Sequence, residues 1–403
     1  MLILNKRQVF TFKYTESECI IMDIRKMAHE VQEKVVAFRR DLHQNPEPSL
    51  KEFRTTKQIA AALDELGVEY RLINPTGVIA EIHGTKGPGK TVALRGDIDA
   101  LSIQEQTGLP FASQVPGMMH ACGHDTHASM LLGSVMVLNQ LKDQFAGTVR
   151  FIFQPAEEVG AGAALAIQQG CLEGVDGIYG VHIGAQKKMG LLTSSAGPHH
   201  AAADRYVIKV TGAACHGAGP HKGRDATVCG AAIVMALQTM VSREFNPMIP
   251  IVVTVGSFHS GSRFNIVSGY AELEGTIRSI DPEVHDAIPG VLKRIAEETA
   301  AAYGCTAEVE YEILTNVLVN NAEMVEKGMA SARKITEFVE YDTPGMGGED
   351  FAEYTKVVPG AFFSLGADGD YPGHSDHYVV NEDAFEVGVA FYAQAAFDFL
   401  TEE

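Results

Sequence analysis

The stretch DRYVIKVTGAACHGAGPHKGRDATVCGAAIVMALQTM (residues 204–240) contains a β-rich run followed by a long apolar helical run. Both patterns recur later in the chain. Hydrophobic periodicity predicts six elements in this part of the chain. They are strand 206–210, helix 226–242, strand 251–257, strand 271–278, helix 284–302 and strand 307–313. The order β-α-β-β-α-β is the ferredoxin-like pattern, a compact unit that can fold as an insertion.

On both sides of this unit, predicted helices and short β-rich runs alternate. Helices are expected at 23–43 and 51–66, with Gly67 as a C-cap, and later at 322–335 and 384–400. The expected strands are 78–83, 91–94, 148–153, 177–183 and 361–365. This alternation favours an α/β fold with functional residues on loops at the strand ends. We therefore expect one discontinuous α/β domain (residues 23–200 and 315–403), interrupted by an inserted domain (residues 201–314), after an N-terminal arm (residues 1–22).

Composition argues against several classes of protein. The 403 residues include 51 acidic and 32 basic side chains, a net charge of −19 at pH 7. This charge repels nucleic-acid backbones and anionic membranes, so we expect neither as a partner. The six cysteines are scattered without regular spacing, which favours a reducing cytoplasm over a disulfide framework. We find no leader peptide and no run near the roughly 18 apolar residues of a membrane span, so we expect a soluble cytoplasmic protein.

A thiol, three imidazoles and a carboxylate crowd into MHACGHDTH (residues 119–127). Cys122 and His124 are separated by one glycine, so both side chains can turn toward one ion. Thiolate with imidazole suits zinc or another late transition metal. Two other interpretations stay open here. One is a catalytic pair with Cys122 as nucleophile and His124 or His127 as base, and the other is a buried structural cluster.

Further candidate ligands occur where other strands are predicted to end. Strand 148–153 runs into Glu157 and Glu158, so one carboxylate could coordinate a metal while the other serves as a general base. His182 closes another β-rich run, and His374 lies in PGHSDH (residues 372–377). Each histidine alone is more often structural. Together the segments offer enough side chains for two ions that share bridging ligands.

Eight motifs follow one another along the chain: RRDLHQNPE, ALRGDIDALSIQEQTGLPFAS, MHACGHDTHASMLLG, FQPAEE, GVHIG, CHGAGPH, GTIRS and GGEDF. Together they resemble the aminoacylase and carboxypeptidase-like metallopeptidases. The similarity is greatest to their branch of hippurate hydrolases, bacterial N-acyl-amino-acid amidohydrolases and plant auxin-conjugate (IAA-amino acid) hydrolases. The match runs from about Arg39 to the C-terminus, and its ordered set of motifs is highly specific.

This resemblance implies a di-metal centre in the discontinuous domain, with Glu157 as the general base. Two divalent ions per subunit are implied, zinc or manganese, with cobalt or nickel as substitutes in vitro. The ligands that match the family pattern are Cys122, His124, Glu158, His182 and His374.

The resemblance also assigns roles within the inserted domain, which it implies to be a lid and dimerisation module. His216 matches a histidine that helps to hold the reacting carbonyl, often from the partner subunit. Asn265 and Arg278 are the candidates for substrate contacts, and Arg278 is alternatively a surface charge on a strand. Residues 251–255 offer an apolar edge strand for pairing two subunits.

Two positions depart from the family pattern. The C-terminal motif usually reads HSPYF, whereas Ser375 is followed here by Asp376 and His377, so either His374 or His377 can supply the ligand. The family commonly has proline after the segment FNIV (residues 264–267), and this chain has Ser268, which puts the role of Asn265 in question.

The sequence thus predicts a metal-dependent amidohydrolase that cleaves N-acyl amino acids, with water as the nucleophile and Glu157 as its base. A metal-dependent dipeptidase or carboxypeptidase is the alternative within the same chemistry. A second alternative is a metal-independent cysteine hydrolase, which would keep its activity in the presence of chelators. The alternative outside enzymes is a scaffold protein that keeps the fold but has no turnover. We expect a homodimer through the inserted domain, or a tetramer.

Overall fold

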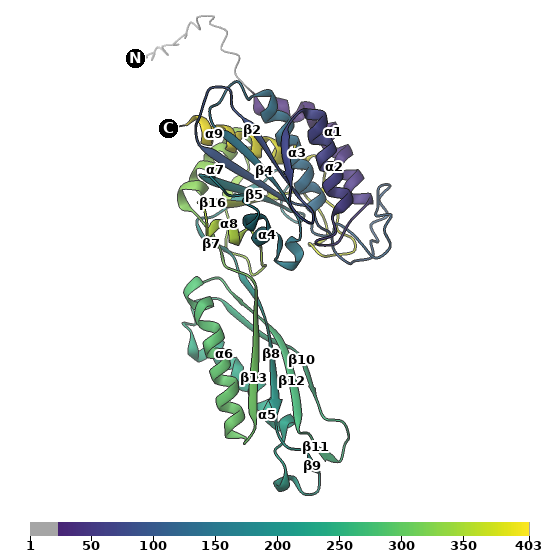
Figure 1. The fold of residues 1–403 in the computed structure, drawn as a ribbon, viewed down its shortest axis with the longest axis vertical. Helices are drawn as coiled ribbons and strands as arrows, with labels where there is room; N and C mark the ends of the chain where they lie inside the picture. Colours follow the sequence, from purple (N-terminus) through teal and green to yellow (C-terminus); the bar gives the residue numbers. More distant parts are fainter. Residues whose placement is uncertain (1–22, 403) are drawn as a thin grey trace, which may run out of the picture.

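The computed structural model describes residues 23–402, which form two lobes joined by a narrow connection (Figure 1). The N-terminal arm predicted for residues 1–22 lies outside the described residues. The middle of the sequence, teal to green in Figure 1, forms the smaller lobe. Strand β8 (Ala202–Thr211) leads into it and β13 (Thr306–Thr315) leads back. The small lobe is therefore inserted within the chain of the large lobe.

An eight-stranded mixed sheet forms the centre of the large lobe, in the order β1-β2-β4-β3-β5-β16-β6-β15. Strands β4, β3, β5 and β16 run parallel, whereas β1, β2 and β6 pair antiparallel with their inner neighbours. The bounds are Glu69–Leu72 (β1), Val78–His83 (β2), Thr91–Asp97 (β3), Thr148–Gln154 (β4), Gly177–Gly184 (β5), Leu192–Ser194 (β6), Val339–Tyr341 (β15) and Gly360–Gly366 (β16). The four parallel strands place their carboxyl ends at one edge, where α/β proteins build their sites.

Helices cover both faces of this sheet. Alternate strand residues belong to separate apolar cores: Leu94 and Phe151 to one, and Ala93 and Ile152 to the other. The first core is closed by the longer helices and the second mainly by two short ones. The longer helices are α1 (Ile24–Gln44), α2 (Phe53–Leu66), α3 (His124–Gln140), α7 (Ala322–Ile335) and α9 (Ala384–Thr401), and the short ones are α4 (Gly162–Gln168) and α8 (Ala352–Thr355).

Local signals explain where helix α1 begins and where helix α2 ends. The Asp23 carboxylate accepts a hydrogen bond of 3.0 Å from the Lys26 amide and caps α1. Helix α2 ends at Gly67, whose φ of 63° lies in the left-handed region that glycine adopts without strain. The predicted helices at 23–43 and 51–66 are thus confirmed to within two residues.

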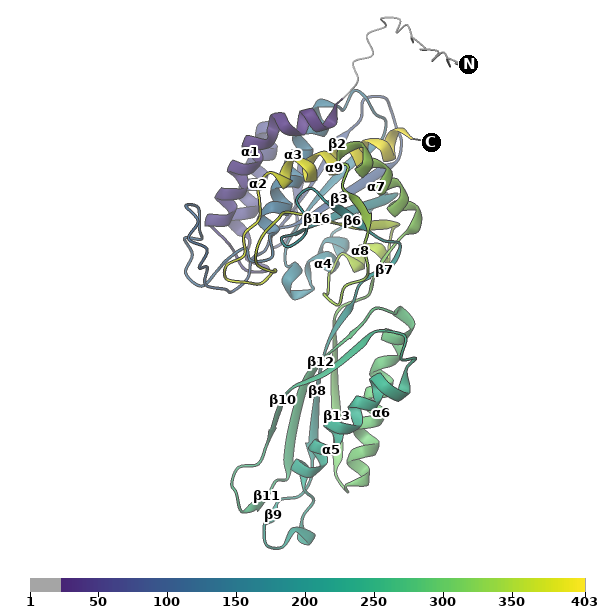
Figure 2. The same ribbon diagram turned by 180° about the vertical axis from the view of Figure 1, so that it is seen from behind.

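The small lobe has its own four-stranded antiparallel sheet and its own apolar core. Its elements follow the predicted order β-α-β-β-α-β: β8, α5 (Ala226–Thr239), β10 (Ile251–Ser260), β12 (Tyr270–Ser279), α6 (Pro282–Ala302) and β13. The strand order β10-β12-β8-β13 places β10 at an edge. A two-stranded ribbon, β9 (Cys215–His216) with β11 (Ile266–Val267), lies at the end away from the large lobe (Figure 2).

The helix predicted at 226–242 differs from the prediction in two respects. Its α-helical part stops at Thr239, and a π-helical turn, Met240–Glu244, follows. The combined stretch Ala226–Glu244 is long and apolar enough to span a membrane by length and composition alone, with 33% of its most apolar part buried. A core helix of a soluble protein passes the same test, so this one stretch is no clear membrane span. The helix packs one side, including Ile233 and Leu237, into the small-lobe core and leaves the other side exposed.

Candidate metal centre

Candidate ligands converge at the carboxyl edge of the parallel strands. His182 lies near the end of β5, and Glu157 and Glu158 follow β4. Cys122 lies just before α3, and His124 is the first residue of that helix. A chain reversal near the C-terminus adds His374, whose amide donates a hydrogen bond of 2.8 Å to the Ala121 carbonyl.

Two ligand groups share the Cys122 thiol. One contains Cys122, His124 and His182, and the other contains Cys122, Glu158 and His374, with the ligand atoms of each group within 4.8 Å of one another. Cys122 Sγ lies 3.4 Å from His182 Nε2, and His374 Nε2 lies 3.5 Å from a Glu158 oxygen. All five predicted ligands are therefore brought together, around a thiol that two ions could share.

Two of the histidines are oriented by a hydrogen bond at Nδ1, the ring nitrogen that faces away from the cluster. His124 Nδ1 lies 3.0 Å from Asp99 Oδ1, and His182 Nδ1 donates to the Ile183 carbonyl at 2.8 Å. Each Nε2 lone pair is thereby left facing the cluster, the usual arrangement of a metal-binding histidine and its supporting acceptor. His127 differs, because Asp97 holds its Nδ1 at 2.5 Å and its Nε2 accepts the Ile183 amide at 2.9 Å. His127 is thus structural here and is not free to act as a base.

The donor set fits a cation. His124 Nε2 and Glu158 Oε1 are buried and have no hydrogen-bond partner among residues 23–402, although buried polar atoms are normally paired. Burial raises the pKa of the Cys122 thiol well above its usual range. Without a cation nearby, this thiol would stay protonated and would be a poor nucleophile. The arrangement therefore favours metal binding over a metal-independent cysteine hydrolase.

His374 and His377 occupy different surroundings, although only three residues separate them. His377 Nδ1 lies 2.7 Å from Asp376 Oδ1, and its ring lies against Tyr371. Within the described chain, His377 belongs to none of the candidate ligand groups. The structure therefore brings His374, and not His377, to Cys122 and Glu158.

We expect His374→Ala to lower the bound metal per chain by about one ion, because it removes one ligand from one of the two groups. His377→Ala is the matched control and should keep the wild-type metal content. Elemental analysis of both proteins after equal dialysis measures the difference. Metal loss in His377→Ala alone would assign the ligand to His377 instead.

Sequence reasoning missed a buried ionic network beside the cluster. Arg95 contacts Asp97 at 2.7 Å, Asp350 at 2.8 Å and Glu349 at 3.0 Å, and all four side chains are buried. A carboxylate oxygen of Glu157 lies within 4.8 Å of those of Glu349 and Asp350. Burial and these two carboxylates raise the pKa of Glu157 well above its usual range. Charged residues within the apolar strand LRGD (residues 94–97) were the signal that could have revealed this network.

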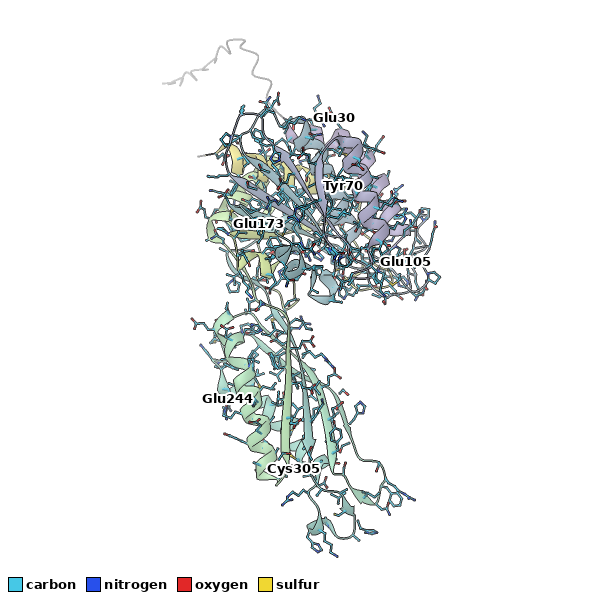
Figure 3. All side chains as sticks on the ribbon, viewed as in Figure 1. Glu30, Tyr70, Glu105, Glu173, Glu244 and Cys305 are labelled. Atoms are coloured by element: carbon cyan, nitrogen blue, oxygen red, sulfur yellow. The ribbon has the colours of Figure 1, made fainter. Side chains whose placement is uncertain are left out.

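Of the predicted substrate contacts, only Arg278 lies near the cluster. Arg278 lines the same cleft of about 720 Å³ as Cys122, Glu157 and His374. His216 instead lies in the ribbon at the far end of the small lobe, and Asn265 immediately precedes its second strand. Cys305, labelled in Figure 3, marks the part of the small lobe away from the large lobe. Within one chain, His216 and Asn265 therefore do not join the metal centre.

Comparison with known proteins identifies relatives in sequence and in fold. Residues 93–398 match the model of peptidase family M20/M25/M40. Thermostable carboxypeptidase 1 of Saccharolobus solfataricus is 38% identical over 390 residues, 94% of this chain and 99% of that protein. N-acetylcysteine deacetylase of Bacillus subtilis is 38% identical over 365 residues, 90% of this chain and 96% of that protein.

A solved structure extends the match to three dimensions. The Bacillus subtilis YXEP protein, described as a dinuclear metal binding peptidase from the M20 family, superposes with a TM-score of 0.83. It shares 36% sequence identity, and the alignment covers 92% of this chain and 99% of that one. Fold, site and relatives together define a metal-dependent hydrolase of the amidohydrolase and metallopeptidase class. The chain belongs to peptidase family M20/M25/M40.

Proposed function

We propose that this enzyme hydrolyses the amide bond of N-acyl amino acids. The observation that carries the proposal is a free carboxylate beside a ligand cluster: Glu157 lines the cleft next to Glu158, and no side-chain hydrogen bond engages its carboxylate within the described chain. A relative at 38% identity is named for deacetylation of an N-acyl amino acid, which supports this substrate class. The discontinuous part, residues 23–200 and 315–403, is the proposed catalytic domain.

Five residues would hold two divalent ions, of zinc or manganese: Cys122, His124, Glu158, His182 and His374. Bound there, such ions would polarise the substrate carbonyl and make water acidic enough to attack it at neutral pH.

The chain's own residues would manage the proton and the substrate. Glu157 would accept a proton from the attacking water and deliver it to the leaving nitrogen, because its carboxylate faces the cleft. Arg278 lines the same cleft and would bind the substrate carboxylate. Its Nη1 lies 3.2 Å from the position that a Cβ on Gly348 would occupy, so glycine there leaves room for the guanidinium.

A panel of substrates tests the proposed class. We expect the purified enzyme to cleave N-acetyl and N-benzoyl amino acids faster than dipeptides with a free amino terminus. The dipeptidase or carboxypeptidase alternative predicts the opposite order. The Saccharolobus relative is named a carboxypeptidase, which supports this alternative. Faster cleavage of dipeptides, with no turnover of any N-acyl amino acid, would replace the proposed function.

The small lobe, residues 201–314, is proposed to be a lid and dimerisation module. Val228 and Met235, seven residues apart and hence on one side of α5, are 50% and 71% exposed. Val252 on the edge strand β10 is 40% exposed. A homodimer would cover this apolar surface, and the partner subunit could then supply His216 and Asn265 to the cleft.

Met235→Glu should shift the enzyme from dimer to monomer in sedimentation velocity, because a carboxylate would be buried without a partner at the interface. Lys293→Glu, on α6 with a side chain 63% exposed, is the control and should remain dimeric. A monomeric wild type at micromolar concentration would contradict the proposed dimer. The cytoplasmic location stays a prediction.

A further inference from the structure

Two apolar side chains line the cleft, one from each lobe. Val159 follows the two glutamates in the large lobe and is 54% exposed, and Leu314 near the end of β13 is 38% exposed. Within the described chain, they are the only aliphatic side chains larger than alanine that line this cleft. The proposed mechanism uses neither residue. Covering an exposed apolar side chain is favourable, so both are candidates for contact with an apolar part of the substrate.

A close backbone contact holds these two residues in one part of the cleft. A Cβ on Gly160, the residue after Val159, would lie 2.3 Å from the Leu314 carbonyl oxygen. Leu314 has no pairing partner on β8, because the register of β13 with β8 shifts between Ile313 and Thr315. The turn that carries the glutamates therefore packs directly on the end of β13. Val159 and Leu314 together form what we call the apolar wall.

The apolar wall adjoins the place where the acyl group of the substrate must lie. Val159 follows Glu157, the proposed base, by two residues, and the attacked carbonyl carbon must lie within reach of the water that this base activates. The acyl group is bonded to that carbon. The amino-acid half is instead held through its carboxylate by Arg278 on β12, and β8 separates β12 from β13 in the small-lobe sheet. The acyl chain can therefore extend along the apolar wall while the carboxylate remains at Arg278.

Charge in the cleft restricts the acyl group further. Glu312, two residues before Leu314, also lines the cleft, and its side chain is 60% exposed. Arg205 Nη1 lies 3.6 Å from Glu312 Oε2, but the same guanidinium donates to Glu274 at 2.6 Å, so it offsets only part of the negative charge. Arg278 is the only lysine or arginine among the cleft residues of the described chain. A carboxylate at the end of an acyl chain would therefore meet Glu312 and find no further basic side chain.

We propose that Val159 and Leu314 bind the acyl chain and make the enzyme selective for long, uncharged acyl groups. N-hexanoyl amino acids are then preferred over N-acetyl and over N-succinyl amino acids. This inference rests on the proposed hydrolysis of N-acyl amino acids and specifies the acyl half of the substrate. The two residues determine specificity through apolar contact and take no part in proton transfer.

The first experiment varies the acyl group on one amino acid. The wild type should have a higher kcat/KM for N-hexanoylalanine than for N-acetylalanine. The double variant Val159→Thr/Leu314→Asn keeps both side chains close to their original size and makes them polar. It should lower the hexanoyl-to-acetyl ratio of kcat/KM by roughly 4- to 15-fold, the contribution of one or two buried methylene groups at about fourfold each. Steady-state kinetics with both substrates measures the ratio.

Leu72→Asn/Val357→Thr is the matched control, because these two side chains are 57% and 58% exposed and do not line the cleft. The control should keep the wild-type ratio. A second pair of substrates, N-acetylnorleucine and N-acetylalanine, differs only in the amino acid, and Val159→Thr/Leu314→Asn should cleave it in the wild-type ratio. A change in this second ratio alone would assign the apolar wall to the amino-acid half and overturn the proposal. An unchanged hexanoyl-to-acetyl ratio would overturn it as well.

Glu312→Gln tests the exclusion of charged acyl groups. N-succinylalanine is compared with N-isocaproylalanine, in which an uncharged isopropyl group takes the place of the terminal carboxylate. We expect the variant to raise the succinyl-to-isocaproyl ratio of kcat/KM by roughly 2- to 5-fold, the range of an exposed charge interaction, and high salt should diminish the effect. Glu308→Gln is the control, because Glu308 is exposed on the same side of β13 and lies outside the cleft. An unchanged ratio in Glu312→Gln overturns the selection against charge.

The same substrates separate failure of this inference from failure of the proposed function. If N-acetylalanine is cleaved as fast as N-hexanoylalanine or faster, the hydrolysis of N-acyl amino acids stands and the acyl selectivity is overturned. If no N-acyl amino acid is cleaved at any chain length, the proposed function fails and the acyl assignment fails with it.

Discussion

Glu157→Gln should lower kcat by roughly 10²- to 10⁴-fold, the range expected when a positioned general base is removed. The amide occupies the same place at the cleft and cannot accept the proton of the attacking water. KM should change little, because Glu157 belongs to neither ligand group that contains Cys122 and is not the proposed carboxylate contact, which is Arg278. Steady-state kinetics on one N-acetyl amino acid measures the effect.

Glu158→Gln is the matched control, since the two glutamates are neighbours of equal size with different contacts. Glu158 lies with Cys122 and His374, so its replacement should reduce bound metal as well as activity. Glu157→Gln should retain the wild-type metal content. Activity close to wild type in Glu157→Gln, with full metal content, would exclude Glu157 as the base.

Arg95→Met should destabilise the fold by about 3–5 kcal/mol, the usual cost of breaking a buried ion pair by removing one partner. The guanidinium contacts Asp97, Glu349 and Asp350, and the substitution would leave these buried carboxylates without it. Even with Arg95 present, burial raises the pKa of Asp350 to about 7. Urea unfolding followed by circular dichroism measures the loss, because the chain has no tryptophan.

Arg40→Met is the control for this experiment. Arg40 pairs with Glu382 on the surface, and its side chain is 48% exposed. An exposed pair of this kind contributes about 1 kcal/mol or less. Equal losses of stability in the two variants would contradict the structural role given to the Arg95 network.

Local patterns in the sequence predicted much of the fold. The six small-lobe elements and helix α7 follow directly from periodicity, because each buries a regular face. Short strands such as β6 and β15, three residues each, escaped prediction because they carry too few residues to show a period. The extension of β3 to Asp97 was missed because charged residues ended the apolar run, although Arg95 and Asp97 pair inside the protein.

The site could be predicted where its functional residues lie close together in the sequence. It could not be predicted where tertiary contacts determine which residues meet. Cys122 and His124 are two residues apart, so their role could be inferred locally. The choice between His374 and His377 depends on the path of a loop that spacing does not specify. The Arg95–Asp350 contact joins residues 255 positions apart and has no local signal. The position of His216 likewise required the folded small lobe.

The most direct test of the metal centre is activity measured together with bound metal in one titration. The enzyme is stripped with a chelator, and zinc or manganese is then restored stepwise while hydrolysis of an N-acetyl amino acid is followed. We predict that activity disappears with the metal and returns as the ions bind, reaching its maximum at two ions per chain. Full hydrolysis by the metal-free enzyme would contradict a catalytic role for the Cys122 cluster.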